Sequence, residues 1–130
     1  MDINKLKTVV SQLLDPKKGI LAADESSKTI AKRLEKIGVE SNPESNLAYR
    51  KMLFTTPEAP EFLSGVILYD ETIRQEIGGV PVAKYLESKG IVPGIKTDKG
   101  AVDLPNFPGE KVTEGLDGLA KRYEEYAAMG

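Results

Sequence analysis

The first segment of the chain has the hydrophobic spacing of an amphipathic helix. Its apolar residues are Ile3, Leu6, Val9, Val10, Leu13 and Leu14. Residues three or four positions apart lie on one face of a helix, so these side chains would share one side. Asp2 is placed to cap the first turn, and Pro16 cannot continue a helix. The pattern therefore predicts a helix that begins after Asp2 and ends before Pro16.

Three later stretches are short, continuous apolar runs. They are Gly19 to Ala23, Val66 to Tyr69 and Ile91 to Lys96. Runs of this length are typical of strands that are buried on both faces, as in a parallel sheet. Each run leads into charged or hydroxyl residues, so we expect three strands with polar carboxyl ends.

A helical pattern follows each predicted strand. Ile30, Leu34 and Ile37 share one face of a helix that ends at Gly38, where we expect a left-handed cap. A second helix begins at Asn42-Pro43 and reaches Phe54. We expect two more helices, one from Pro81 to Lys89 closed by Gly90, and one after a Gly- and Pro-rich loop with Leu116, Leu119, Tyr123 and Tyr126 on its buried side.

Strand and helix alternate three times, which favours an α/β fold with a parallel sheet. A doubly wound sheet and a closed barrel both fit this alternation. A complete (β/α)₈ barrel needs about 250 residues, and this chain has 130. We therefore expect residues 1–130 to form a single incomplete TIM-barrel domain that contains the first three βα units. The last residues, Ala127 to Gly130, resemble the end of a helix with its cap.

Composition and charge narrow the choice of function. The chain is 40% hydrophobic and 29% charged, which is ordinary for a soluble globular domain. Its 18 basic and 20 acidic residues leave a net charge of -2 without a basic block, so nucleic acid is not an expected partner. The chain has neither an apolar run long enough to span a membrane nor the basic start of a signal peptide. We expect a cytoplasmic protein with no membrane partner.

The chain contains no Cys and no His. It therefore cannot form a disulfide, a thiolate nucleophile or a zinc site built on those residues. Any catalysis must use Asp, Glu, Lys, Ser, Thr or Tyr. EF-hand spacing is also missing, so we expect neither a metal nor another cofactor.

The turn after the first predicted strand carries the first candidate site. Asp24 follows the strand directly, where a carboxylate can act as an acid, a base or an electrostatic partner. Capping of the next helix is an equally good interpretation of Asp24. The hydroxyls of Ser26, Ser27 and Thr29, with Lys28, could bind an anion at the helix start. For these hydroxyls the sequence alone favours ordinary capping.

The end of the third predicted strand carries Lys96 and Lys99. A lysine there can bind phosphate by charge or, if desolvated, act as a nucleophilic amine. Alternation along the strand places Lys96 opposite Ile95, so we favour Lys96 as the residue that faces a site. The acidic turn after the second strand is interpreted as a polar strand end. We predict that Asp24, Asp70 and Lys96 lie at the same end of the sheet.

Several ordered segments resemble the amino-terminal third of class I fructose-bisphosphate aldolase. They are GILAADES with TIAKRL, LFTTPE, SGVIL, GIVPGIK with DKG, and GLDGLAKR. The resemblance runs from the first helix to the last residue. It implies a (β/α)₈ barrel that cleaves fructose 1,6-bisphosphate to dihydroxyacetone phosphate and glyceraldehyde 3-phosphate through a lysine Schiff base, without metal.

The resemblance also implies roles for individual residues. Asp24 would contact substrate hydroxyls and handle protons during carbon–carbon cleavage. Ser26 and Thr29 would hold one phosphate together with Lys96, and Arg33 would lie near the phosphate at the other end of the sugar. The Schiff-base lysine would belong to later strands, beyond residue 130. We therefore expect this chain to be inactive alone.

Two other functions fit the same residues. One is a non-catalytic phosphate-binding or assembly module that reuses barrel strands 1–3, and the other is a different Schiff-base barrel enzyme acting on another sugar phosphate. A three-stranded parallel sheet leaves an edge unpaired and one face uncovered, so the isolated chain should be unstable or should associate. We expect the full-length protein to bind a sugar phosphate and to form a homo-oligomer.

Overall fold

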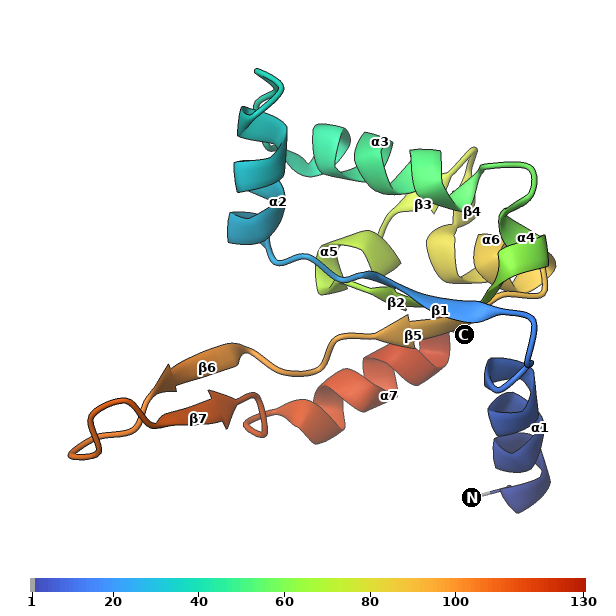
Figure 1. The fold of residues 1–130 in the computed structure, drawn as a ribbon. Coiled ribbons are helices and arrows are strands. Elements are labelled where there is room, and N and C mark those ends of the chain that lie inside the picture. Colours follow the sequence, from blue (N-terminus) through green and yellow to red (C-terminus); the bar gives the residue numbers. More distant parts are fainter. Residues whose placement is uncertain (1) are drawn as a thin grey trace.

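A three-stranded parallel sheet forms the centre of the computed structural model, which describes residues 2–130. Its strands lie in the order β1 (Gly19–Ala23), β2 (Leu63–Leu68) and β5 (Val92–Ile95) (Figure 1). The predicted α/β class with parallel strands is therefore confirmed. The first strand has the predicted bounds, whereas β2 begins earlier than the predicted start at Val66.

The helices predicted from periodicity are all present. They are α1 (Ile3–Leu13), α2 (Ser27–Glu35), α3 (Pro43–Phe54), α6 (Val82–Ser88) and α7 (Leu119–Met129). Asp2 caps α1 by accepting hydrogen bonds from backbone N–H groups, and Asn42 caps α3 in a capping box. Gly38 has the left-handed φ expected of a helix-ending glycine. Within residues 2–130, no helix is both long enough and apolar enough to cross a membrane.

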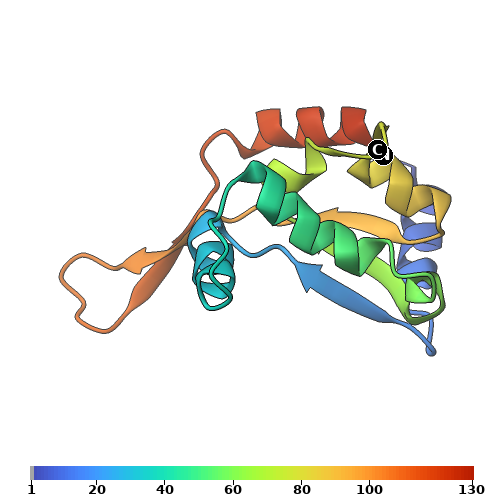
Figure 2. The same ribbon diagram turned by 90° about the horizontal axis from the view of Figure 1, so that it is seen from above.

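Several short elements were not predicted. The acidic turn after β2 is the helix α5 (Asp70–Ile73), preceded along the chain by α4 (Ala59–Phe62). One small hairpin pairs β3 (Glu76–Ile77) with β4 (Val80–Pro81). The predicted Gly- and Pro-rich loop is a longer hairpin of β6 (Gly100–Asp103) and β7 (Lys111–Glu114), which extends away from the rest of the molecule in both views (Figures 1 and 2). These elements are too short and polar to show a clear hydrophobic period.

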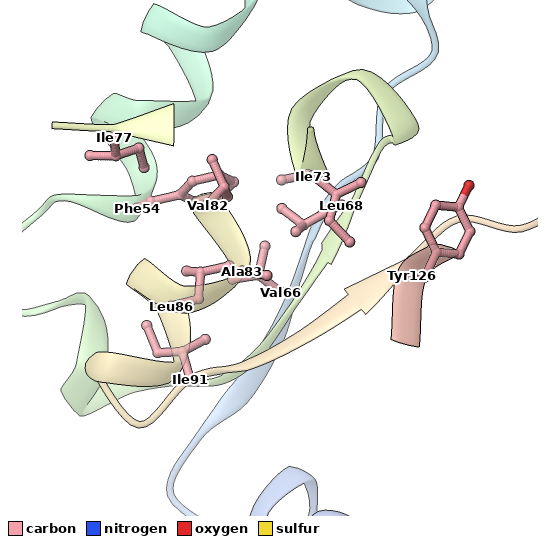
Figure 3. Close-up of a cluster of buried hydrophobic side chains, with 11 residues drawn as sticks. Phe54, Val66, Leu68, Ile73, Ile77, Val82, Ala83, Leu86, Ile91 and Tyr126 are labelled. Atoms are coloured by element: carbon pink, nitrogen blue, oxygen red, sulfur yellow. The ribbon is translucent and has the colours of Figure 1, made fainter. Parts of the chain in front are cut away.

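One face of the sheet packs against helices and forms the core (Figure 3). Val66 and Leu68 of β2 are buried against side chains from α3, α5 and α6. The cluster comprises Ala23, Phe54, Val66, Leu68, Ile73, Ile77, Val82, Ala83, Leu86, Ile91 and Tyr126. Because side chains alternate along a strand, the intervening residues of β1 and β2 point to the other face.

That other face is largely uncovered, which corrects the prediction of strands buried on both sides. Ile20 of β1 is 51% exposed, because β1 is an outer strand and α1 approaches this face only near the amino ends of the strands. Two helix positions predicted to be buried, Leu116 and Tyr123, are exposed as well, and so is Ile37, which the sequence places on one helix face with Ile30 and Leu34. Ile37 follows the end of α2, Leu116 precedes α7, and Tyr123 lies on the outer side of α7.

Helix α1 packs near the amino ends of the strands. The Ser64 hydroxyl donates to the carbonyl of Leu13 at 3.0 Å. The approach is close, because a Cβ atom at Gly65 would lie 2.6 Å from Cδ2 of Leu13 and would displace that side chain. The opposite ends of the strands remain accessible, and the polar residues gather there.

Candidate functional site

A cleft of about 480 Å³ lies at the carboxyl ends of β1 and β5. Five residues singled out from the sequence line it, namely Asp24, Ser26, Thr29, Arg33 and Lys96. They come from the end of β1, from helix α2 and from the end of β5. The parallel strand order brings these distant segments together, because carboxyl ends of parallel strands meet at one edge.

The turn between β1 and α2 forms one wall of the cleft. Asp24 is half-buried there, and among residues 2–130 its carboxylate accepts no hydrogen bond. Ser26 is the N-cap of α2, without a side-chain capping bond, and its hydroxyl lies 3.1 Å from the Thr29 hydroxyl. In the part of the chain that the structure describes, Asp24 therefore caps no helix, and two adjacent hydroxyls are available at the start of α2.

Arg33 lies at the rim of the same wall. Its Nη1 donates to Oε1 of Glu25 at 2.5 Å and to the Tyr49 hydroxyl at 2.9 Å. The bond with Tyr49 and the charge of Glu25 raise the pKa of Arg33 above its usual value. The Glu25 side chain is only 7% exposed, so the ion pair anchors the exposed Arg33 to a buried carboxylate.

Lys96 lies on the opposite wall. Its Nζ donates to Oδ2 of Asp98 at 2.5 Å, and the backbone N–H of Gly100 donates to the other oxygen at 2.9 Å. The hydrogen bond from Lys96 lowers the pKa of Asp98. Arg122 of α7 fixes the neighbouring backbone by donating to the carbonyls of Thr97 and Gly115.

Arg50 anchors the first wall from behind. Its side chain is fully buried, and its Nη2 donates to the backbone carbonyl of Glu25 at 2.6 Å. Its Nη1 is 3.4 Å from a carboxylate oxygen of Glu71, and its guanidinium lies 5.6 Å from the centre of the Tyr69 ring. The turn that carries Asp24 and Ser26 is therefore tied to α3 by a charged hydrogen bond.

Asp24 follows β1 directly, whereas Tyr69 separates Asp70 from the end of β2. The prediction that Asp24, Asp70 and Lys96 lie at one end of the parallel sheet is confirmed. Asp70 nevertheless does not line the cleft. It accepts hydrogen bonds from Arg74 and from the Tyr126 hydroxyl on the helix side of the sheet. Tyr69 lines the cleft instead.

Sequence reasoning assigned no role to three lining residues, Glu25, Tyr69 and Asp98. Asp98 can be predicted from the sequence, because residues two apart in an extended segment face the same side and Lys96 is predicted to face the site. The position of Tyr69 can be predicted only when the strand register is known. Ala23 pairs with Leu68, so the residues that follow them, Asp24 and Tyr69, lie side by side. No pattern in the sequence indicates that Glu25 is buried.

The lining groups suit an anionic, hydroxyl-rich ligand. Asp24, Glu25 and Asp98 supply carboxylates, while Arg33, Lys96 and Lys99 supply cations. Cations and neighbouring hydroxyls bind phosphate, and a carboxylate without a partner can accept a proton or a hydroxyl hydrogen bond. Across residues 2–130, no three carboxylates gather closely enough to hold a metal ion.

Comparisons with known proteins give one consistent result. A family model described as "Fructose-bisphosphate aldolase class-I" matches residues 5–130. A probable fructose-bisphosphate aldolase class 1 from Xanthomonas campestris is 53% identical over 131 residues, covering all of this chain and 39% of the relative. A fructose-bisphosphate aldolase from Plasmodium falciparum is 46% identical over 127 residues, covering 97% of this chain and 35% of the relative.

The fold is also similar to that of a solved structure. Fructose-bisphosphate aldolase from Plasmodium falciparum, in complex with TRAP and a small-molecule inhibitor, superposes with a TM-score of 0.91 at 46% identity. The match covers 98% of this chain and 37% of that one. The chain thus spans about two fifths of the length of the curated relatives it matches.

Proposed function

This chain belongs to the class-I fructose-bisphosphate aldolase family, and we propose that it forms the first three βα units of a (β/α)₈ barrel aldolase. The barrel would reversibly cleave fructose 1,6-bisphosphate to dihydroxyacetone phosphate and glyceraldehyde 3-phosphate. The parallel order of β1, β2 and β5 supports this proposal, because adjacent barrel strands are parallel and consecutive. The match to about two fifths of each relative supports it as well.

One observation carries the proposal. Five residues from separate parts of the chain, which the family resemblance marks as site residues, line a single cleft. An enzyme of this fold places its site at the carboxyl ends of the strands, where this cleft lies. An ordinary solvated surface would not require Asp24, Arg33 and Lys96 to converge.

We assign proton handling to Asp24. Cleavage of the carbon–carbon bond requires loss of the proton from a substrate hydroxyl, while the bonding electrons form a double bond to the Schiff-base carbon and the C=N pair moves to its nitrogen. The Asp24 carboxylate accepts no hydrogen bond among residues 2–130, so its oxygens are available to a substrate hydroxyl. The nearby Arg50 bond to the Glu25 carbonyl keeps this turn in place.

We assign phosphate binding to the remaining residues. The hydroxyls of Ser26 and Thr29 would hold one phosphate with Lys96, and Arg33 would lie near the other. A nucleophilic amine must present a free lone pair, whereas Nζ of Lys96 is held in an ion pair by the Asp98 carboxylate. Lys96 therefore suits phosphate binding better than Schiff-base formation, and the Schiff-base lysine would lie outside these 130 residues.

The test combines the chain alone with a chimera. The chain alone should cleave no fructose 1,6-bisphosphate, and borohydride trapping with dihydroxyacetone phosphate should leave no adduct on Lys96 or Lys99. A chimera in which this chain replaces the matching segment of Plasmodium falciparum aldolase should regain cleavage. A covalent adduct on either lysine would instead make a lysine near β5 the nucleophile.

The chimera also separates the proposal from its alternatives. A folded chimera that binds inorganic phosphate but cleaves nothing would favour the non-catalytic phosphate-binding module. Cleavage of a different sugar phosphate would favour another Schiff-base enzyme.

We further propose that the full-length protein is a cytoplasmic, glycolytic lyase that assembles as a homo-oligomer. Size-exclusion chromatography with light scattering would test the oligomeric state.

A further inference from the structure

Both cations proposed to bind phosphate in the cleft already hold a carboxylate. Arg33 pairs with Glu25 and Lys96 pairs with Asp98, each at 2.5 Å. An incoming phosphate therefore meets cations whose charge is neutralised from within the chain.

The two ion pairs differ in how easily they can open. The Glu25 side chain is 7% exposed, and Arg33 is also bonded to Tyr49, so this pair is fixed in place. Asp98 is 36% exposed and Lys96 is 25% exposed, so water or a ligand can reach both. The ammonium of Lys96 carries three donor hydrogens on a flexible stem, which allows it to change partners.

We propose that Asp98 is a specificity-determining residue that acts as a displaceable internal anion for the Lys96 phosphate subsite. This inference rests on the proposed role of Lys96 as a phosphate ligand. The Asp98 carboxylate competes with phosphate for Nζ of Lys96, and the short tether between the two residues keeps its local concentration high. Because the N–H of Gly100 holds the second oxygen, Asp98 can release Lys96 without losing all its partners.

The competition selects for a ligand with two phosphate groups. A single phosphate must displace Asp98 with only the contacts of one subsite. A bisphosphate that also reaches the Arg33 side of the cleft is held at two points, so its second contact occurs at high effective concentration. Asp98 thus keeps free inorganic phosphate out of the subsite at concentrations where a bisphosphate enters.

The experiment compares Asp98→Asn with a matched control. Inorganic phosphate is titrated into the ¹⁵N-labelled chimera, and the amide signal of Gly100 reports the position of the Asp98 carboxylate. Asp98→Asn should tighten phosphate binding roughly tenfold, which is an ordinary coupling between neighbouring charged sites. The control is Asp103→Asn, which removes the carboxylate that pairs with Lys111 on the exposed β6–β7 hairpin. This variant should change phosphate affinity less than about twofold, because solvent screens the Asp103–Lys111 pair.

The same variants in the chimera provide a second readout. The inhibition constant of inorganic phosphate for aldol cleavage should fall by a similar factor in Asp98→Asn and stay constant in Asp103→Asn. Unchanged or weaker phosphate binding in Asp98→Asn would overturn the inference and make Asp98 a residue that orients Lys96.

Lys96→Met distinguishes this failure from failure of the proposed function. If the Lys96→Met chimera binds phosphate as tightly as the unmodified chimera, Lys96 is not a phosphate ligand, and both proposals fail. If Lys96→Met loses phosphate binding while Asp98→Asn does not gain it, only the inference fails. The gain in Asp98→Asn combined with the loss in Lys96→Met supports both.

Discussion

Asp24 and Asp70 occupy nearly equivalent positions in the sequence and different environments in the structure. Asp24 directly follows β1, and Asp70 follows β2 after a single residue, Tyr69, and begins α5. Asp24 lines the cleft without a hydrogen-bond partner among residues 2–130, whereas Asp70 accepts bonds from Arg74 and Tyr126 beside the core.

The register of two strands explains this difference. Ala23 pairs with Leu68, so the next residues, Asp24 and Tyr69, continue on the open face of the sheet. Asp70 comes one position later and turns to the helix side. A carboxylate at a strand end is therefore a candidate catalytic group only when its register places it on the accessible face.

The largest expected effect is the loss of activity when Asp24, the proposed catalytic member of the pair, is replaced. In the active chimera, Asp24→Asn should lower kcat roughly 10²- to 10⁴-fold, because it removes the proposed proton acceptor. The melting temperature should hardly change, since no hydrogen bond from residues 2–130 holds this carboxylate in the fold. Steady-state kinetics with thermal unfolding would measure both. A large drop in melting temperature with unchanged kcat would return Asp24 to a structural role.

Lys96 should give the opposite kinetic signature. Lys96→Ala should mainly raise KM, by roughly 10- to 150-fold, which corresponds to ~1.5–3 kcal/mol for a charged hydrogen bond to phosphate. The value of kcat should change much less, because a phosphate contact is made in the ground state and in the transition state alike. Equal losses in kcat and kcat/KM would argue that Lys96 acts on the reacting atoms.

Asp70→Asn should affect stability rather than catalysis. Loss of the charged bonds from Arg74 should lower the free energy of unfolding by about 1 kcal/mol, a small value because both side chains are partly exposed. Urea unfolding measures this loss, and the chimera should keep its kcat. A fall in kcat comparable to that of Asp24→Asn would contradict the assignment of Asp70 to the helix side.

Tyr126→Phe tests the same arrangement from the other partner. The hydroxyl donates to Asp70 at 2.8 Å, and its removal should cost ~0.5–1 kcal/mol of unfolding free energy. The double variant Asp70→Asn with Tyr126→Phe should lose less than the sum of the single variants, because both changes remove the same bond. Strict additivity would indicate that the two side chains do not interact.

The smallest expected effect is the loss at low pH of the stabilisation that Asp70 provides. The hydrogen bond from Arg74 lowers the pKa of Asp70 below its unfolded value of about 3.9. The stabilisation from this shift is present above the unfolded pKa and is lost as pH falls through the folded pKa. The difference in unfolding free energy between the unmodified chain and Asp70→Asn should therefore narrow below about pH 4. Urea titrations over this pH range measure the difference. A difference that stays constant with pH would contradict the assignment.

Much of the fold was predictable because local signals agree with it. Helix α3 has its cap at Asn42 and its proline at the first helical position, and β1 is a short apolar run between a glycine and an acid. The β6–β7 hairpin was missed because its exposed residues show no regular alternation. Arg50 was missed because a charged residue within a helix resembles a solvated one until the packing around it is known.

The sequence by itself determined the strands, the long helices and the residues that can bind phosphate or exchange a proton. Local propensity and hydrophobic period act over a few residues, and the family segments preserve residue types in order. Only the tertiary structure decided which of these groups meet. The pairing of β1 with β2 directs Asp24 and Asp70 to opposite faces, and the path after β5 joins Lys96 to Asp98. Such contacts depend on register and on side-chain burial, which arise only when distant segments pack together.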